Sequence, residues 1–212
     1  MFVLYGGTFD PVHDGHLAIA RAARDTLQAE IRLMPAADPP HRPPPGAGGS
    51  DRAAMLELAV AGETGLRVDL RELRRDERSW SVDTLRALRR EIGDERPVAL
   101  VLGADSFAGL PTWKDWQALP GLAHFVVASR AGTPLDPREL DPALAEAIEG
   151  RIVDDPAALR AAPAGAVLYL GQPLHPQSAT AIRAAIAAGE AWRDLVPAAV
   201  AAYIDRHGLY RG

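Results

Sequence analysis

The chain has 212 residues, of which 48% are hydrophobic, enough for one sizeable globular domain over residues 1–212 and few for two. It contains no cysteine, which excludes disulfides, catalytic thiolates and zinc–thiolate sites, and its formal net charge of -5 argues against a general nucleic-acid-binding protein. No stretch approaches the roughly 20 apolar residues of a membrane span, and the N-terminus lacks the pattern of a secretion signal, so we expect a cytoplasmic protein.

Short apolar runs alternate with helical patterns along the chain. The predicted strands cover residues 2–5, 31–34, 66–70, 98–102, 124–128 and 167–170, and the predicted helices cover about 15–29, 51–62, 81–92, 179–189 and 197–206. This alternation is typical of an α/β protein with a doubly wound, mostly parallel sheet that helices cover on both faces. Ligands of such folds bind at the carboxyl ends of the strands, so functional residues are expected just after them.

A glycine-rich turn follows the first predicted strand and reads GGTFDPVHDGH from Gly6 to His16. The glycines let backbone N–H groups approach a phosphate, and the helix expected to begin near Asp14 adds partial positive charge. His13 and His16, one helical turn apart, should project from the same side. Capping histidines or a metal pair are the alternatives, but no further ligand clusters beside them. We predict a phosphate site, with Asp10 bracing loop amides.

The segment 35–50 is dense in proline and glycine and carries His41 and Arg42 at its centre. Only 34 residues precede it, too few for an independent domain of the usual size. We therefore interpret the segment as a loop that reaches over the site and not as an interdomain linker.

Gly103 and Asp105 follow the predicted strand 98–102. A carboxylate at this position can accept hydrogen bonds from the hydroxyls of a ribose. The alternative is that Asp105 forms an ordinary Asx turn. Residues 134–163 mix acidic and alanine-rich helical turns. We expect them to form a peripheral insertion without chemistry of its own.

A second helix N-terminus is predicted at Ser178-Ala179-Thr180-Ala181-Ile182-Arg183. On its own, Ser178 would be a helix N-cap and Arg183 a solvated side chain. Together with the upstream glycine-rich turn, the same residues predict a second contact to the phosphates of a nucleotide.

Four of these elements, in this order, resemble the nucleotidylyltransferase superfamily and, within it, the bacterial nicotinate-nucleotide adenylyltransferases. The glycine-rich turn matches the superfamily's T/HxGH signature, and SATAIR matches its (S/T)xTxxR element. DPPHRP at 38–43, and GADS at 103–106 followed by PTW at 111–113, resemble the narrower family. The resemblance covers nearly the whole chain and implies a Rossmann-like nucleotidylyltransferase fold. It departs at 175–177, where His-Pro-Gln stands at positions that are more often apolar.

The resemblance implies that the adenylyl group of ATP is transferred to nicotinate mononucleotide in NAD biosynthesis. It implies His13, His16 and Arg183 as catalytic groups, and ATP-binding residues at Gly6, Gly7, Thr8, Phe9, His13, Gly15, His16, Gly103, Asp105, Ser178, Thr180 and Arg183. It implies mononucleotide-binding residues at His41, Arg42, Thr84, Asp105, Trp113, Lys114 and Arg130. In this scheme Trp113 stacks on the pyridine ring, Thr84 helps hold the nicotinate carboxylate and Arg130 faces the phosphate. Trp80, Trp116 and Trp192 match no family position, and we expect them in the core.

The expected chemistry needs no general base, because a phosphate monoester with a second pKa of about 6 is already largely anionic. We therefore interpret the histidines as donors that stabilise charge. Mg²⁺ is expected to be bound mainly through ATP's phosphates, with no metal site of the protein's own. Two alternatives stay open, a pantetheine-phosphate adenylyltransferase and a non-catalytic nucleotide-binding regulator. The sequence also leaves open whether the protein is a monomer or a homo-oligomer.

Overall fold

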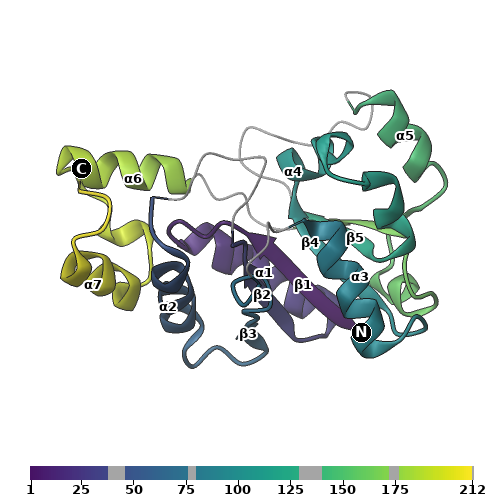
Figure 1. Ribbon diagram of the computed structural model, residues 1–212, viewed down its shortest axis with the longest axis horizontal. Coiled ribbons are helices and arrows are strands. Elements are labelled where there is room, and N and C mark those ends of the chain that lie inside the picture. The colour runs from purple at the N-terminus through teal and green to yellow at the C-terminus, as the bar shows by residue number, and fades with distance from the viewer. Residues whose placement is uncertain (38–45, 76–79, 129–139, 172–176, 212) are drawn as a thin grey trace.

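A parallel sheet forms the centre of the protein, as the computed structural model in Figure 1 shows. The structure describes residues 1–37, 46–75, 80–128, 140–171 and 177–211. Its described strands join one seven-stranded sheet in the order β3-β2-β1-β4-β5-β7-β6, and every neighbouring pair is parallel. The strands are β1 Phe2–Gly7, β2 Ile31–Pro35, β3 Leu66–Val68, β4 Val98–Gly103, β5 His124–Ala128, β6 Ile152–Val153 and β7 Val167–Leu170. The predicted α/β class with a parallel sheet is confirmed.

Helices cover both faces of this sheet because successive side chains of a strand point to opposite faces. In β1, Val3 and Tyr5 pack in the cluster that contains α1, α2, α6 and α7, whereas Phe2 and Leu4 pack with α3, α4 and α5. The helices are α1 Asp14–Leu27, α2 Gly49–Val60, α3 Ser81–Ile92, α4 Ala104–Ala108, α5 Pro142–Ile148, α6 Ala179–Ala188 and α7 Ala198–His207. Short 3₁₀ helices are η1 Leu110–Thr112, η2 Trp116–Gly121, η4 Pro156–Arg160 and η5 Arg193–Leu195. The protein is therefore doubly wound, as predicted.

The strand order reverses between β1 and β4, which creates the crevice where ligands bind in open α/β sheets. Strand register brings the functional turns to one edge. Gly7, at the end of β1, lies opposite Pro35 of β2, and Gly103, at the end of β4, lies opposite Ala128 of β5. The glycine-rich turn and the Gly103 turn therefore share the carboxyl edge of the sheet.

Residues 140–163 differ from the peripheral insertion that the sequence predicted. They contain α5, the two-residue strand β6 and η4, and β6 pairs with β7 as an edge strand of the central sheet. Ile148 of α5 and Leu159 of η4 are buried in the clusters on opposite faces of the sheet. The segment is thus part of the fold. Its strand escaped prediction because Ile152 and Val153 are too few to show a period.

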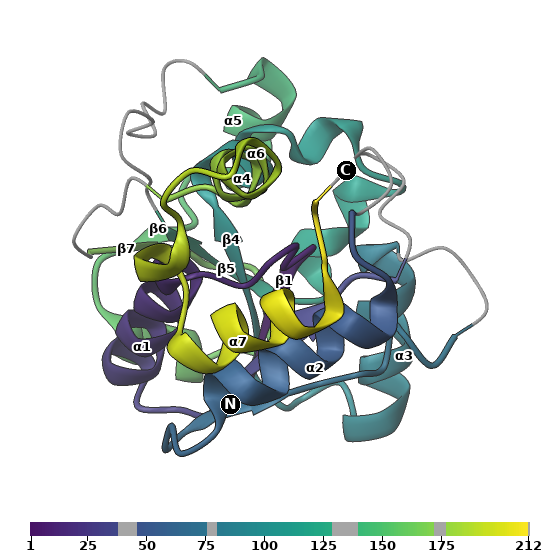
Figure 2. The same cartoon turned by 90° about the vertical axis from the view of Figure 1, so that its left-hand side faces the viewer.

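The C-terminal part of the chain packs against the first half. In Figure 2, α7 lies across α2. The tail that follows α7 then rises to the level of α6. This route brings the last described residues to the carboxyl edge of the sheet, where the glycine-rich turn lies.

Candidate active site

The turn after β1 is shaped by one glycine and one left-handed residue. Phe9 has a φ of 51°, and its ring lies so close to Gly7 that a Cβ there would stand 2.9 Å from it. Only glycine leaves room for the ring at this point. The chain then passes a cis Asp10–Pro11 bond and enters α1, with His13 as the N-cap. The predicted helix start near Asp14 is confirmed.

His13 and His16 stack on each other at the N-terminus of α1, with ring centroids 3.7 Å apart, and both are buried. The backbone N–H of His13 donates to Nδ1 of His16 at 3.3 Å. Because Nδ1 accepts this bond, Nε2 is the ring nitrogen of His16 that carries a proton in this arrangement. The predicted common side of the two rings is confirmed, and Nε2–H is the donor that His16 presents.

The second motif folds back onto the first. Ser178 is the N-cap of α6, and its Oγ accepts from the backbone N–H of Ala181 at 3.1 Å, as a capping serine should. Arg183 donates from Nη1 to the carbonyl oxygen of Asp10 at 2.6 Å and from Nη2 to Oγ1 of Thr180 at 3.4 Å. Two motifs 173 residues apart therefore meet at one point.

The carboxylate of Asp10 is the centre of this meeting point and is only 4% exposed. It accepts from the backbone N–H groups of Gly46 and Ala47 at 2.7 and 3.0 Å, and from the hydroxyl of Tyr210 at 2.8 Å. Nη1 of Arg183 lies 3.5 Å from Oδ2. The expectation that Asp10 braces loop amides is confirmed. Its contact with Tyr210 carried no sequence signal, because 200 residues separate the two.

Arg52 of α2 is a further residue of the site, and no sequence pattern indicated it. Its side chain is 1% exposed, and its guanidinium donates to the carbonyl oxygens of Thr8 (2.8 Å), Ala37 (3.2 Å) and Ala47 (3.2 Å). Burial lowers the pKa of Arg52, and the charge of Asp10 acts in the opposite direction. The arginine thus ties the turn after β1 to both flanks of residues 38–45.

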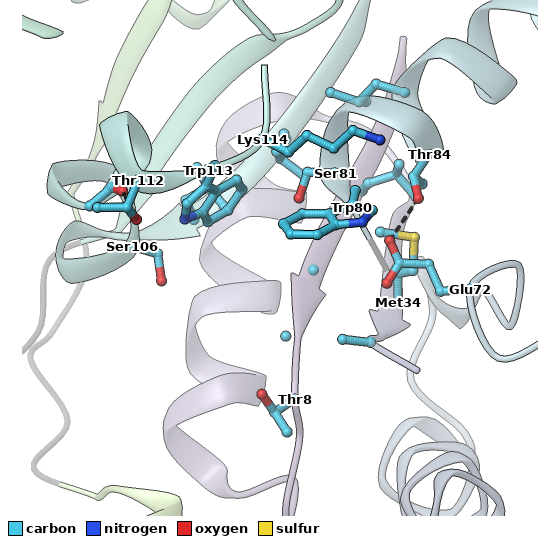
Figure 3. A pocket seen from close by; sticks show the side chains of 18 of the residues that line it. Thr8, Met34, Glu72, Trp80, Ser81, Thr84, Ser106, Thr112, Trp113 and Lys114 are labelled. Atoms are coloured by element: carbon cyan, nitrogen blue, oxygen red, sulfur yellow. Dashed lines mark hydrogen bonds between the residues drawn. The ribbon is translucent and has the colours of Figure 1, made fainter. Parts of the chain in front are cut away.

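A cavity of about 240 Å³ opens beside the glycine-rich turn. Gly6, Gly7 and Thr8 line one part of it. Figure 3 shows Thr8 in that part and the indole rings of Trp80 and Trp113 in another. Its other lining residues are Leu4, Met34, Ala36, Glu72, Ser81, Thr84, Leu85, Leu100, Leu102, Asp105, Ser106, Gly109, Thr112 and Lys114. One ligand that carries both a phosphate and an aromatic ring can therefore reach the turn and the indoles together.

Thr84 lies on the cavity wall as predicted, but its hydroxyl is engaged within the protein. It donates to Oε1 of the buried Glu72 at 2.8 Å, the dashed bond in Figure 3. It also accepts from Nη1 of Arg75 at 3.2 Å. A hydroxyl has a single hydrogen, so Thr84 does not offer it to a ligand in this arrangement. Glu72, which also lines the cavity, and Arg75, which bonds Thr84, are polar residues that sequence reasoning missed.

Trp80 corrects a prediction. It was expected in the core, whereas the structure places it half-buried on the cavity wall, directly before α3. Nζ of Lys114 lies 5.7 Å from the centroid of a Trp80 ring and 2.8 Å from a carboxylate oxygen of Asp83. The position of Trp80 four residues before Thr84 was the available signal. Trp116 and Trp192 are buried in the core, as expected.

The remaining predicted residues fall on the same edge of the sheet or outside the described part of the chain. Gly15 is buried in the first turn of α1, and Asp105 is exposed in the first turn of α4. Phe9 is 1% exposed and meets the ring of His16 edge-on at 5.0 Å, so its side chain supports the histidine. His41, Arg42 and Arg130 lie outside the described residues.

Metal-binding clusters and membrane-spanning helices are both absent from the described part of the chain. It contains no group of three or more His, Asp or Glu side chains that could hold a metal ion. No described helix is both long enough and apolar enough to cross a membrane.

Comparison with known proteins gives consistent matches over the chain. Residues 4–185 match the family described as "Cytidylyltransferase-like". The chain is 57% identical over 99% of its length to a Stenotrophomonas maltophilia protein named "Probable nicotinate-nucleotide adenylyltransferase", covering 96% of that protein. A Pseudomonas fluorescens protein of the same name is 46% identical, with coverages of 98% and 96%.

A solved structure has the same fold. Plasmodium falciparum nicotinic acid mononucleotide adenylyltransferase complexed with NaAD aligns with a TM-score of 0.70 at 15% identity, covering 99% of this chain and 96% of that one. At this identity the likeness establishes the fold alone. The family rests on the closer relatives and on the matched family model. The chain therefore belongs to the cytidylyltransferase-like family and, within it, to the nicotinate-nucleotide adenylyltransferases.

Proposed function

We propose that the protein transfers the adenylyl group of ATP to nicotinate mononucleotide and releases nicotinate adenine dinucleotide and pyrophosphate. The observation that carries this proposal is the 57% identity, over 99% of the chain, to a relative named for this activity. The site geometry supports it, because one cavity joins a phosphate-type turn to two indole rings.

The reaction is one in-line displacement at phosphorus. A phosphate oxygen of the mononucleotide forms a bond to the α-phosphorus of ATP, and the bond from that phosphorus to the oxygen bridging to the β-phosphate breaks. Pyrophosphate leaves with the electron pair. Catalysis then depends on holding the groups in line and on stabilising charge on the phosphoryl oxygens. An Nε2–H donor at His16 and a cation at Arg183 suit that task.

On the ATP side, we assign the turn from Gly6 to Thr8 and the N-terminus of α1 to the phosphates, together with His13 and His16. Backbone N–H groups and the positive end of a helix favour anions at this position. We assign Ser178, Thr180 and Arg183 to the outer phosphates. The contact of Arg183 with Asp10 supports this, because it holds the guanidinium beside the same turn.

On the acceptor side, we assign the pyridine ring to the indoles of Trp113 and Trp80. The ring is cationic in the mononucleotide, so stacking on an indole adds roughly 0.5–2 kcal/mol of cation–π attraction. Because the Thr84 hydroxyl is engaged with Glu72, we assign the nicotinate carboxylate to the N-terminal end of α3 and to backbone amides near Lys114. Asp105 is assigned to ribose hydroxyls. The proposed roles of His41, Arg42 and Arg130 rest on sequence.

Mg²⁺ is proposed to arrive with ATP, bound to its phosphates and to water, as the ion commonly binds at nucleotide sites. The described ligand atoms near the turn belong to two imidazoles, those of His13 and His16, to the exposed carboxylate of Asp105, and to the buried carboxylate of Asp10, which already accepts three hydrogen bonds. This set is poorly matched to an oxygen-seeking ion. The cytoplasm is the proposed compartment, since ATP serves as a substrate.

The test is turnover of labelled ATP with three acceptors: nicotinate mononucleotide, nicotinamide mononucleotide and phosphopantetheine. The nicotinate acceptor is expected to give a kcat/KM at least tenfold above the nicotinamide acceptor, about 1.4 kcal/mol, because an amide presents its own donors to donors. Preferred turnover of phosphopantetheine would assign the chain to that acceptor instead. ATP binding without turnover of any acceptor would leave only a nucleotide-binding role.

A further inference from the structure

The tail that follows α7 ends against the glycine-rich turn. Tyr210 has a φ of 64°, a left-handed conformation that few residues other than glycine adopt, so tertiary contacts must hold it there. The tail reaches the turn from the C-terminal side of the protein, past α2 and α7 (Figure 2). Tyr210 lies outside both phosphate motifs, residues 6–16 and 178–183. It also does not line the cavity to which the pyridine ring is assigned, called the acceptor cavity below.

Tyr210 meets the two motifs at their junction. Its hydroxyl donates to Oδ1 of Asp10 at 2.8 Å, and Arg183 is bound to the same residue through its carbonyl oxygen and carboxylate. The Tyr210 ring and Cδ of Arg183 flank Gly46 together: a Cβ added there would lie 3.1 Å from the ring and 3.4 Å from Cδ. Ring, hydroxyl, carboxylate and guanidinium therefore form one packed group.

The hydroxyl of Tyr210 remains a donor throughout the working pH range. Burial is the main cause that raises the pKa of Tyr210 far above its ordinary value, and the negative charge of Asp10 raises it further. A protonated hydroxyl keeps one side of the Asp10 carboxylate occupied, so the other oxygen stays directed at Gly46 and Arg183. Tyr210, near the far end of the chain, thus holds Asp10 in this orientation together with the backbone N–H groups of Gly46 and Ala47.

We propose that Tyr210 is a positioning residue that fixes the guanidinium of Arg183 for ATP through Asp10. The inference rests on the proposed function, because Arg183 is assigned there to the phosphates of ATP. When Tyr210 loses its hydroxyl, Oδ1 of Asp10 keeps only the N–H of Ala47 as a described hydrogen-bond donor, so the carboxylate is held less firmly beside Arg183. Arg183 keeps its bond to the Asp10 carbonyl oxygen but loses a fixed carboxylate partner. The effect falls on ATP and leaves the acceptor cavity alone.

The test is a double-mutant cycle between Tyr210→Phe and Arg183→Ala, measured with labelled ATP and nicotinate mononucleotide. Tyr210→Phe is expected to lower kcat/KM for ATP about tenfold, the scale of one hydrogen bond to a charged group, and to change KM for the acceptor less than twofold. In the Arg183→Ala background the same substitution is expected to cost less than twofold, since its target is absent.

The matched control is Tyr203→Phe on α7. Tyr203 makes the same kind of bond, from its hydroxyl to Oδ1 of Asp51 at 3.0 Å, but it does not touch Asp10 or Arg183. Its kinetics should equal those of the unmodified protein. An equal loss from Tyr210→Phe in both backgrounds, no loss in either, or an equal loss from Tyr203→Phe would each overturn the proposal.

A second readout separates this inference from the proposed function. Affinity for α,β-methylene ATP, measured by calorimetry on the unmodified protein and the three variants of the cycle, gives the coupling without turnover. Each protein is measured at a temperature where it is folded. If the protein binds the analogue with the expected coupling but adenylylates no acceptor, the proposed function fails and the positioning role of Tyr210 stands. If turnover is normal and coupling is absent in both measurements, the reverse holds.

Discussion

Replacement of His16 tests the chemistry of the site most directly. In the structure its Nδ1 accepts the backbone N–H of His13, so its other nitrogen is a donor whose position is fixed before any ligand binds. The ring is 8% exposed and packs between His13 and Phe9. His16→Ala removes one preorganised donor and, with it, the bond that helps cap α1.

The two losses have different sizes. A fixed donor aimed at developing negative charge contributes about 2.7–4 kcal/mol to the transition state, so turnover should fall about 10²–10³-fold. Loss of the cap and of ring packing should lower the free energy of unfolding by about 1–3 kcal/mol. ATP binding should weaken far less than turnover, because the donor acts mainly on charge that develops during transfer.

His16→Gln separates the two effects. A glutamine at this position of a helix can still accept the N-cap N–H, so stability should recover most of its loss. Turnover should stay at least tenfold low, because the amide hydrogens are not held at the position of Nε2. His207→Ala, an exposed histidine on α7, is the control for general effects. Near-normal turnover of His16→Ala at a temperature where it is folded would refute the reasoning.

Two further predictions concern Thr84 and His124. Thr84→Val removes the hydroxyl that donates to the buried Glu72 carboxylate at 2.8 Å and should lower the free energy of unfolding by about 1–3 kcal/mol. Thr84→Ser keeps the hydroxyl, so its stability should stay close to that of the unmodified protein. Denaturant unfolding of both variants measures this, and equal stabilities would contradict it. His124 donates from Nε2 to the carbonyl oxygen of Ala162 and accepts at Nδ1 from Ala166, and burial lowers its pKa below 6.5. Below that pH the unfolded chain binds a proton that the folded chain does not, so stability should fall with acidification by up to about 1.4 kcal/mol per pH unit. Unfolding from pH 7.5 to 5 should show this slope in the unmodified protein and a shallower one in His124→Gln, and parallel curves would count against it.

The central strands and the first motif were predictable because their signals are local. Runs such as residues 98–102 are continuous and apolar, as strands buried on both faces must be, and they lie where predicted. His13 and His16 follow a strand and open a helix, so their stacking follows from helical spacing alone. These parts of the site need no knowledge of the rest of the chain.

Other parts depend on contacts that no local pattern reveals. Arg52 sits in a helix among small and polar residues and looks like an ordinary surface cation, yet it is the largest side chain that the described fold buries completely. The bond between Asp10 and Tyr210 joins opposite ends of the sequence. The sequence predicted Trp80 in the core because it matches no family position, whereas its side chain lines the cavity. In each of these three cases the position of the side chain depends on contacts with residues distant in sequence, which local sequence patterns do not reveal.

The contacts of Arg52 have a consequence for how the family can vary. Its guanidinium binds the carbonyl oxygens of Ala37 and Ala47, which flank residues 38–45 on either side. Lengthening a loop between anchored ends costs little, about 0.6 kcal/mol for each doubling of its length. Insertions, deletions or grafted sequences between these anchors should therefore leave β2, α2 and the turn at Thr8 in place. Because His41 and Arg42 of this segment are proposed to bind the acceptor, we expect such changes to alter acceptor preference more than the proposed phosphate site.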